Sequence, residues 1–337
     1  MKIEKGTAWQ QLRSLCFDAI PAGATAYFTR ALPLSEWRFK GSFQVVGCTK
    51  KLITLEAAGV EVGSALLADT EYLLDHAAEH RATVRDFMVE TDWHSPAWAI
   101  TTAYYWAFFS AMAITRLTGR TTWFLDRAAI SDFRKLANST AQPGAGAMNF
   151  ALKAYSTGVT REIHLSPSRA QLHDSLWAIF HRLVDELYSA ADQGANPLEY
   201  RLLWCMREAR LRISRDWPSR VRNLMNYRPG HAYREVIHDT RIDAAPYIRR
   251  HSPMSFERVI SSFEDQILRV QSPDPLADTS LICRLLILFA ITLAGIAEEL
   301  HKDVVDRQSG DRRWFHLRHG FLQKHCSAHD SIWLLDG

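Results

Sequence analysis

The sequence has few cysteines and lacks the short motifs of the common nucleotide and hydrolase sites. Its five cysteines are odd in number and form no CxxC pair, which argues against a disulfide framework and suits a reducing compartment. There is also no Walker loop, GxGxxG or GxSxG. P-loop nucleotide hydrolysis, a Rossmann cofactor site and α/β-hydrolase chemistry therefore lack support, and we predict no cofactor.

The chain also lacks a strong net charge and an apolar leader. Its 40 Lys and Arg residues nearly balance its 37 Asp and Glu residues, for a net charge of +3, so there is no overall signature of a polyanion-binding protein. The first residues, MKIEKGTAW, lack the apolar core of a signal peptide. We therefore expect a cytoplasmic protein.

The most prominent feature is a long uncharged stretch, SPAWAITTAYYWAFFSAMAITRLTG, from Ser95 to Gly119. No residue between Pro96 and Ile114 is charged. Ser95 followed by proline suits a helix start, and Gly119 suits a left-handed helix end. Because apolar residues occupy every side, we predict a central helix that is nearly inaccessible to solvent, in an all-α core.

A membrane span is the competing interpretation of this stretch, since a span needs about 20 residues. The stretch, however, contains Thr101, Thr102 and Ser110, and its aromatic residues lie in the middle rather than at the two ends. A second apolar run, Leu285–Ala297, is short for a span. We expect no membrane association.

The remaining pattern is mostly helical with a little β-structure. Helices are predicted over Trp9–Ile20, Val60–Glu90, Leu198–Arg215, Phe256–Val270 and Asp278–Asp306, and a helix or helix-like connector over Thr121–Ala137. Ser166 or Ser168 is predicted to cap a further helix that runs to about Asp192. Strands are predicted over Trp37–Gly47 and Lys51–Glu56, and a hairpin joins Phe150–Tyr155 to Thr160–Leu165. On the second helix, the predicted core stripe is Leu66, Leu73, Ala77 and Val84. His76 and His80 have the spacing of a metal pair there, or else they lie on an exposed face.

The most informative stretch for function is DWPSRVRNLMNYRPGHAYREV, Asp216 to Val236. Between Arg201 and Arg234 there are nine arginines and no lysine, and up to Arg234 the only acids are Glu208 and Asp216. Arginine without lysine favours bidentate contacts to phosphate or carboxylate.

A short helix is predicted inside this stretch, with Pro218 near its start and Pro229-Gly230 ending it. Arg222 and Asn226 would share one face, and His231 follows the turn. An arginine that stabilises phosphorane charge and a histidine that moves a proton are sufficient for RNA cleavage through the 2′-hydroxyl without a metal. The alternative is structural: Asn226 and Tyr227 lock a turn, and the arginines form salt bridges with Glu90, Asp126, Asp185 or Glu186.

An aromatic AYYWAFFSAMAITRLTG helix followed by an RN…NYRPG turn resembles bacterial proteins of the HEPN superfamily (higher eukaryotes and prokaryotes nucleotide-binding). The resemblance covers roughly residues 95–238. The family motif is an arginine, usually a polar residue next, and a histidine after about four to six intervening residues. Arg222-Asn223 matches its start. His231 follows after eight intervening residues, and Tyr227 occupies the expected place of the histidine. Arg234 and His238 have only three residues between them.

The resemblance implies a mainly α, HEPN-like helical bundle with a small β-hairpin insertion near 148–166 and additional N- and C-terminal segments. The segments would be a mixed 1–90, a core at 91–240 and a helical 241–337. It implies RNA binding or metal-independent RNA cleavage in a phage-defence or toxin–antitoxin system. The catalytic residues would be Arg222, Asn223 and His231, and the substrate-binding residues Asn226, Tyr227, Arg228, Arg220 and Arg234. The partner would be RNA, with a homodimer or a protein encoded nearby; the alternative is a non-catalytic interaction subunit.

A last cluster consists of His316, His319, His325, Cys326 and His329. Such side chains can bind zinc, but the cluster lacks a CxxC framework, and neighbouring arginines and Lys324 would repel a cation. We therefore expect a basic surface helix here and predict no metal site.

Overall fold

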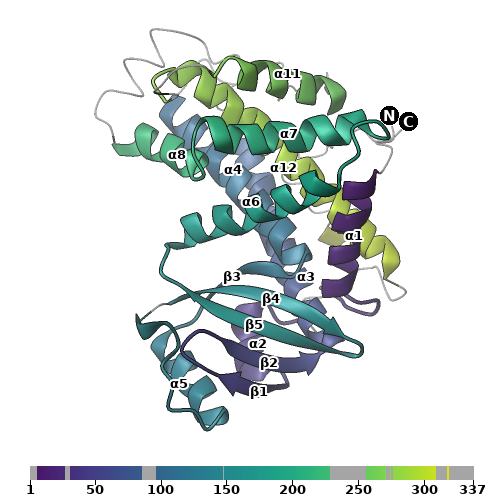
Figure 1. The fold of residues 1–337 in the computed structure, drawn as a ribbon, viewed down its shortest axis with the longest axis vertical. Helices are drawn as coiled ribbons and strands as arrows, with labels where there is room; N and C mark the ends of the chain where they lie inside the picture. Colours follow the sequence, from purple (N-terminus) through teal and green to yellow (C-terminus); the bar gives the residue numbers. More distant parts are fainter. Residues whose placement is uncertain are drawn as a thin grey trace.

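The computed structural model describes residues 6–26, 31–85, 96–146, 148–227, 256–270, 274, 276–308 and 317–318. Within them the protein is mainly α-helical, with one antiparallel sheet of five strands. The sheet lies at one end of the molecule, and long helices extend from it toward a second group of helices at the other end (Figure 1). The coarse fold prediction, mainly α with some β-structure, is confirmed.

The elements follow one another from α1 to α12. The helices are α1 (Thr7–Ala19), α2 (Leu34–Lys40), α3 (Gly59–Arg85), α4 (Pro96–Leu117), α5 (Arg127–Leu136), α6 (Leu172–Ala190), α7 (Pro197–Arg212), α8 (Trp217–Tyr227), α11 (Phe256–Leu268) and α12 (Thr279–Arg307), with a short 3-10 turn η2 at Pro143–Gly146. The strands are β1 (Phe43–Cys48), β2 (Ile53–Ala58), β3 (Arg120–Phe124), β4 (Asn149–Thr157) and β5 (Thr160–Ser168).

The predicted hairpin is confirmed as β4 and β5, with Gly158 at a φ of 90° in the turn. It is not a small insertion, however. The strand order is β1-β2-β5-β4-β3, so the hairpin forms the middle of the sheet. Leu55 of β2 pairs with Ile163 of β5, and Thr122 of β3 pairs with Ala151 of β4. An isolated two-stranded hairpin is marginally stable in water, and these flanking strands satisfy its edges.

Two predicted elements are wrong in type. The region Thr121–Ala137 is not one helix, because Arg120–Phe124 forms β3 before α5 begins. Its threonines and tryptophan favour a strand once β4 offers a partner, and Asp126 then caps α5 by accepting a hydrogen bond from the Ala129 amide at 2.7 Å. Likewise, Trp37 lies in α2 rather than in a strand, with its indole buried.

The core is built around α4, as predicted, with α3 and α12 packed against it. The predicted α3 stripe of Leu66, Leu73, Ala77 and Val84 is buried. The prediction that α4 is inaccessible on all sides is wrong for one face. Trp98 is 63% exposed, and Tyr105 and Phe109 are half-buried, because no described element covers that side completely.

One described helix, α12, is long and apolar enough to cross a membrane by length and composition alone. Most of its apolar window is buried inside the fold, where it packs against α4 and α11. The same composition is expected for the core helix of a protein without any membrane.

An ion pair with a buried arginine joins the helices to the sheet. Arg116, in the last turn of α4, places its Nε atom 3.0 Å from Asp69 Oδ2 on α3. Its Nη1 atom donates to the carbonyl oxygen of Thr122 in β3 at 2.7 Å and also to the Thr121 hydroxyl. Asp69 Oδ1 accepts from the backbone amide of Leu34, where α2 begins, at 3.2 Å. The two side chains therefore connect α3, α4, β3 and α2.

We expect Asp69→Ala to lower the free energy of unfolding by about 3–5 kcal/mol, because it leaves the buried Arg116 guanidinium without a counter-charge. Equilibrium urea unfolding measures this loss. Asp132→Ala is the matched control, since Asp132 is exposed and lies 4.0 Å from Lys135 on the surface of α5; it should cost less than about 1 kcal/mol. Equal losses of stability for the two variants would contradict the stabilising role given to the Arg116–Asp69 pair.

Candidate functional site

The predicted site residues divide into a described and an undescribed group. Arg220, Arg222, Asn223, Asn226 and Tyr227 lie on α8. His231, Arg228 and Arg234, the second histidine candidate His238, and the cluster from His316 to His329 lie outside the described residues. The structure therefore locates the arginine half of the predicted site.

Helix α8 is anchored by its apolar side, and the predicted residues flank that side or lie opposite it. Trp217, Val221 and Met225 are buried. Asn226 Oδ1 accepts a hydrogen bond from the Thr101 hydroxyl of α4 at 2.9 Å. The Arg222 guanidinium lies over the Tyr104 ring, 5.1 Å from its centroid, and donates to Asn223 Oδ1 at 2.7 Å. Arg222 and Asn226 therefore both contact α4, as their four-residue spacing predicts.

The structure adds a histidine that the sequence analysis missed. His173, in the first turn of α6, places its Nε2 atom 3.5 Å from Arg222 Nη1. Its Nδ1 atom lies 2.5 Å from the Tyr104 hydroxyl, and its ring lies 4.4 Å from that of Phe108. His173 is 49 residues before Arg222 in the chain. No motif in the sequence marks it among the 14 histidines.

The neighbours of His173 select one neutral tautomer. Arg222 can only donate, so the Nε2 atom that faces it is favoured as an acceptor. Nδ1–H then donates to the Tyr104 oxygen, and the Tyr104 hydroxyl donates to Ser219 Oγ, 3.2 Å away. Ser219 Oγ also accepts from the Trp177 indole at 3.1 Å. In this arrangement Nε2 of His173 is a proton acceptor directed at Arg222.

Burial sets the charge states in this cluster. It lowers the pKa of His173 to about 4, and the positive charge of Arg222 contributes to the same shift. It also raises the pKa of Tyr104 to about 12, although the polar groups of Ser219 and Trp177 oppose the shift. At neutral pH the site therefore combines a neutral imidazole, a protonated phenol and a positive guanidinium.

Part of the arginine-rich run has a structural role instead. Arg210 lies 2.6 Å from Asp185, and Arg207 lies 3.7 Å from the same carboxylate. The run also contains ion pairs between Arg201 and Glu264, at 2.5 Å, and between Arg212 and Glu208, at 2.9 Å. The salt bridges expected with Asp185 are thus present. In contrast, within the described part of the chain no carboxylate pairs with Arg220 or Arg222. These two cations remain available to an anionic ligand.

His76 and His80, which have the spacing of a metal pair but were also candidates for an exposed face, are half-buried and pack against aromatic rings. His80 stacks on Tyr105 and Phe109, and His76 stacks on Phe109 at 5.1 Å between ring centroids. In the described ranges, no three His, Cys, Asp or Glu side chains gather in a way that could bind a metal ion.

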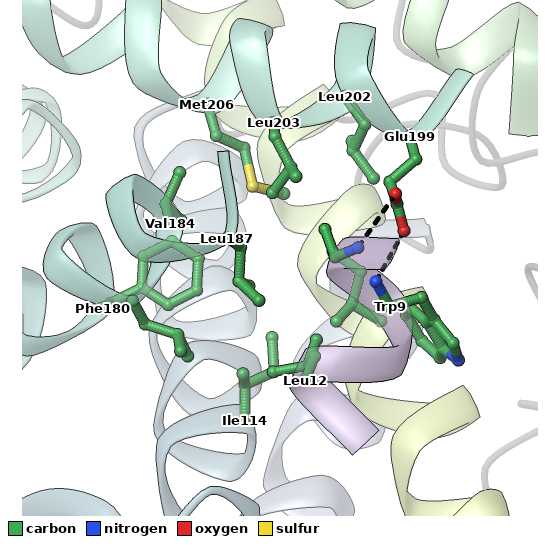
Figure 2. A pocket seen from close by; sticks show the side chains of 13 residues that line it. Trp9, Leu12, Ile114, Phe180, Val184, Leu187, Glu199, Leu202, Leu203 and Met206 are labelled. Carbon is green, nitrogen blue, oxygen red and sulfur yellow. Dashed lines mark hydrogen bonds between the residues drawn. The ribbon is translucent and has the colours of Figure 1, made fainter. Parts of the chain in front are cut away.

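A separate cavity lies between α1, α4, α6, α7 and α12, as Figure 2 shows. It has a volume of about 40 Å³, and its lining is apolar apart from Glu199. The Glu199 carboxylate accepts hydrogen bonds from the backbone amides of Ala8 and Trp9, at 3.2 and 2.6 Å, and thereby caps α1. This cavity is a packing gap with a helix cap at its rim rather than a reactive site.

No family model, curated protein or solved structure matches this chain. The functional assignment therefore depends on the geometry around Arg222.

An NMR titration of the histidine side chains should give His173 a pKa of about 4, well below the ordinary value of about 6.5. Because the folded-state pKa lies below the unfolded one, His173 should lower stability as pH falls from about 6.5 toward 4. In Arg222→Ala the pKa should rise but stay below 6.5, since burial is the larger cause. A pKa at or above 6.5 in the wild type would show that His173 is not partly buried beside Arg222 as described.

Val184→Ile should raise the free energy of unfolding by up to about 1 kcal/mol, because Val184 lines the cavity and the added methylene can fill it. Val221→Ile makes the same change at a fully buried position of α8 that does not line the cavity. It should instead destabilise by about 1–3 kcal/mol. Urea unfolding of both variants tests whether this gap accepts a methylene.

Proposed function

We propose that this protein binds RNA and cleaves it without a metal, with Arg222 at the scissile phosphate and His173 as the proton-transfer group. The observation that supports this most is the contact of Arg222 with a neutral histidine while no described carboxylate neutralises the guanidinium. Both side chains are partly exposed, so a phosphate can reach them.

The reaction would follow from the position of these groups. When the Arg222 guanidinium turns to the phosphate, it frees the lone pair of His173 Nε2 that faces it. This Nε2 then accepts the proton of the ribose 2′-hydroxyl, whose oxygen attacks the adjacent phosphorus. Arg222 stabilises the negative charge that develops on the non-bridging oxygens. The bond to the 5′-oxygen breaks, and that oxygen takes up a proton. The products are a 2′,3′-cyclic phosphate and a 5′-hydroxyl end.

The other residues of the site would orient these two. Asn223 holds the Arg222 guanidinium, and Asn226 is held by Thr101. Tyr104 fixes the tautomer of His173. His231, four residues beyond the end of α8, stays the sequence candidate for the acid that protonates the leaving oxygen. In this proposal His173 supplies from α6 the histidine that the HEPN motif places shortly after its arginine.

The biological setting belongs to the same proposal. A HEPN-like ribonuclease of a phage-defence or toxin–antitoxin system would act in the cytoplasm as a homodimer or with a protein encoded nearby. The non-catalytic alternative is favoured by one observation: four of the seven described arginines in the run from Arg201 are engaged in ion pairs. Against this alternative, a subunit that only binds a partner protein would not need a neutral histidine in contact with Arg222.

The experiment is incubation of the purified protein with labelled single-stranded RNA in EDTA. We expect cleavage that leaves 2′,3′-cyclic phosphate ends. His173→Ala and Arg222→Ala should each lower the rate by about 10²–10⁴-fold, without loss of the folded state by circular dichroism.

Matched controls separate the site from its surroundings. Arg212→Ala removes an arginine of the same run that is paired with Glu208, and His164→Ala removes a histidine on the sheet; both should cleave normally. His231→Ala tests the candidate acid independently. If the wild type cleaves no RNA, alone or with its genomic neighbour, the catalytic proposal fails and the interaction subunit takes its place.

A further inference from the structure

A row of aromatic rings lies along the face of α4 that no described element covers completely. Trp98, Tyr105 and Phe109 are seven and four residues apart, which places them on one side of a helix. Trp98 is 63% exposed, while Tyr105 and Phe109 are half-buried. We call these three residues the α4 row. It contains no aliphatic side chain and no charge.

The inner part of the row is held in place by α3. The His80 ring stacks on Phe109 at 5.4 Å and 13°, and on Tyr105 at 5.6 Å and 23°. Burial lowers the pKa of His80, so this ring is neutral at neutral pH. The rings of Tyr105 and Phe109 are therefore fixed, and the Trp98 indole extends the row into solvent.

The row leads directly to the Arg222 site. The Tyr105 ring lies 6.4 Å from that of His173. Trp98 precedes by one helical turn Thr101, whose hydroxyl bonds to Asn226 of α8. The exposed indole and the Arg222 guanidinium thus border the same junction between α4 and α8, which Figure 1 shows at the end of the molecule away from the sheet.

The charge near the Trp98 end of this surface differs from the charge near Tyr72. Tyr72 of α3 is also 63% exposed and contacts His76. There, however, Glu79, whose side chain is 65% exposed, lies 3.3 Å from His76. Asp75, in the next turn of α3 after Tyr72, is paired with Arg318 at 2.6 Å and adds no free charge. Phosphates would be repelled from the Tyr72 end and attracted to the Trp98 end, where Arg222 has no described carboxylate partner.

We propose that the α4 row binds unpaired bases of single-stranded RNA next to the phosphate held by Arg222, with Trp98 as the main stacking platform. The inference rests on the proposed RNA function and specifies its substrate. Flat neutral rings beside a cation match the alternation of bases and phosphates in a single strand. A duplex keeps its bases paired and stacked, and therefore cannot offer them to these rings.

The test measures binding separately from cleavage. The probe is a fluorescent ~10-nucleotide 2′-O-methyl oligonucleotide, which lacks the attacking hydroxyl, either single-stranded or annealed to its complement. We expect the wild type to prefer the single strand. Trp98→Ala should weaken its binding roughly 5- to 150-fold, and Trp98→Phe should recover most of that loss, since stacking tolerates any aromatic ring.

Two exposed aromatic residues serve as controls. Tyr72→Ala removes a ring of equal exposure at the acidic end, and Phe39→Ala removes a 73% exposed ring on α2. Both should bind the single strand as the wild type does. A loss with Tyr72→Ala equal to that with Trp98→Ala would overturn the assignment to the Trp98 end.

The outcomes distinguish this inference from the proposed function. If Arg222→Ala weakens binding but Trp98→Ala does not, the row is not a base platform and the Arg222 proposal stands. Equal affinity of the wild type for duplex and single strand overturns the inference in the same way. If the wild type binds neither probe at low salt, both proposals fall. Sedimentation of Trp98→Ala would then show whether the row is an interface between two copies of the chain.

Discussion

The ion pair of Arg116 and Asp69 is the interaction on which the join between helices and sheet depends. The Arg116 guanidinium is costly to bury, and a carboxylate and two oxygens of β3 compensate for the water that it loses. The geometry is therefore demanding: α3, α4 and β3 must all be in place at once. Hydrophobic contacts between these elements would tolerate sliding, whereas this pair fixes the relative position of the elements.

Helix α4 connects this ion pair to the candidate site. Its C-terminal turn holds Arg116, and its N-terminal half carries both Thr101 and Tyr104. Two adjacent residues of this half have different environments, since Tyr104 is buried against His173 whereas Tyr105 is partly exposed to solvent. A single helix thus forms the core on three sides, and its fourth side carries the aromatic residues that we propose for base stacking.

Sequence periodicity correctly predicted the helices and strands whose secondary structure is determined by their own residues, independently of what they pack against. The α3 stripe, the β4–β5 hairpin and the helical course of α4 all follow from local spacing. Strand β3 was missed because five residues beside a helical pattern become a strand only when β4 pairs with them. His173 was missed because its partners lie 49 and 69 residues away. The exposure of Trp98 was missed for a related reason: a helix with no polar side gives no sign of which side lacks a neighbour.

The cap that Glu199 of α7 provides to α1 joins two helices that are far apart in the sequence and are therefore synthesised at different times. Asn196 caps α7 by accepting from the Glu199 amide, and Glu199 in turn satisfies amides of Ala8 and Trp9, about 190 residues earlier. During synthesis at about 5–20 residues per second, α1 leaves the ribosome roughly 10–40 s before its cap exists. Helix α1 is therefore synthesised long before its cap, and its apolar side stays uncovered by α6 and α7 until those helices have been made.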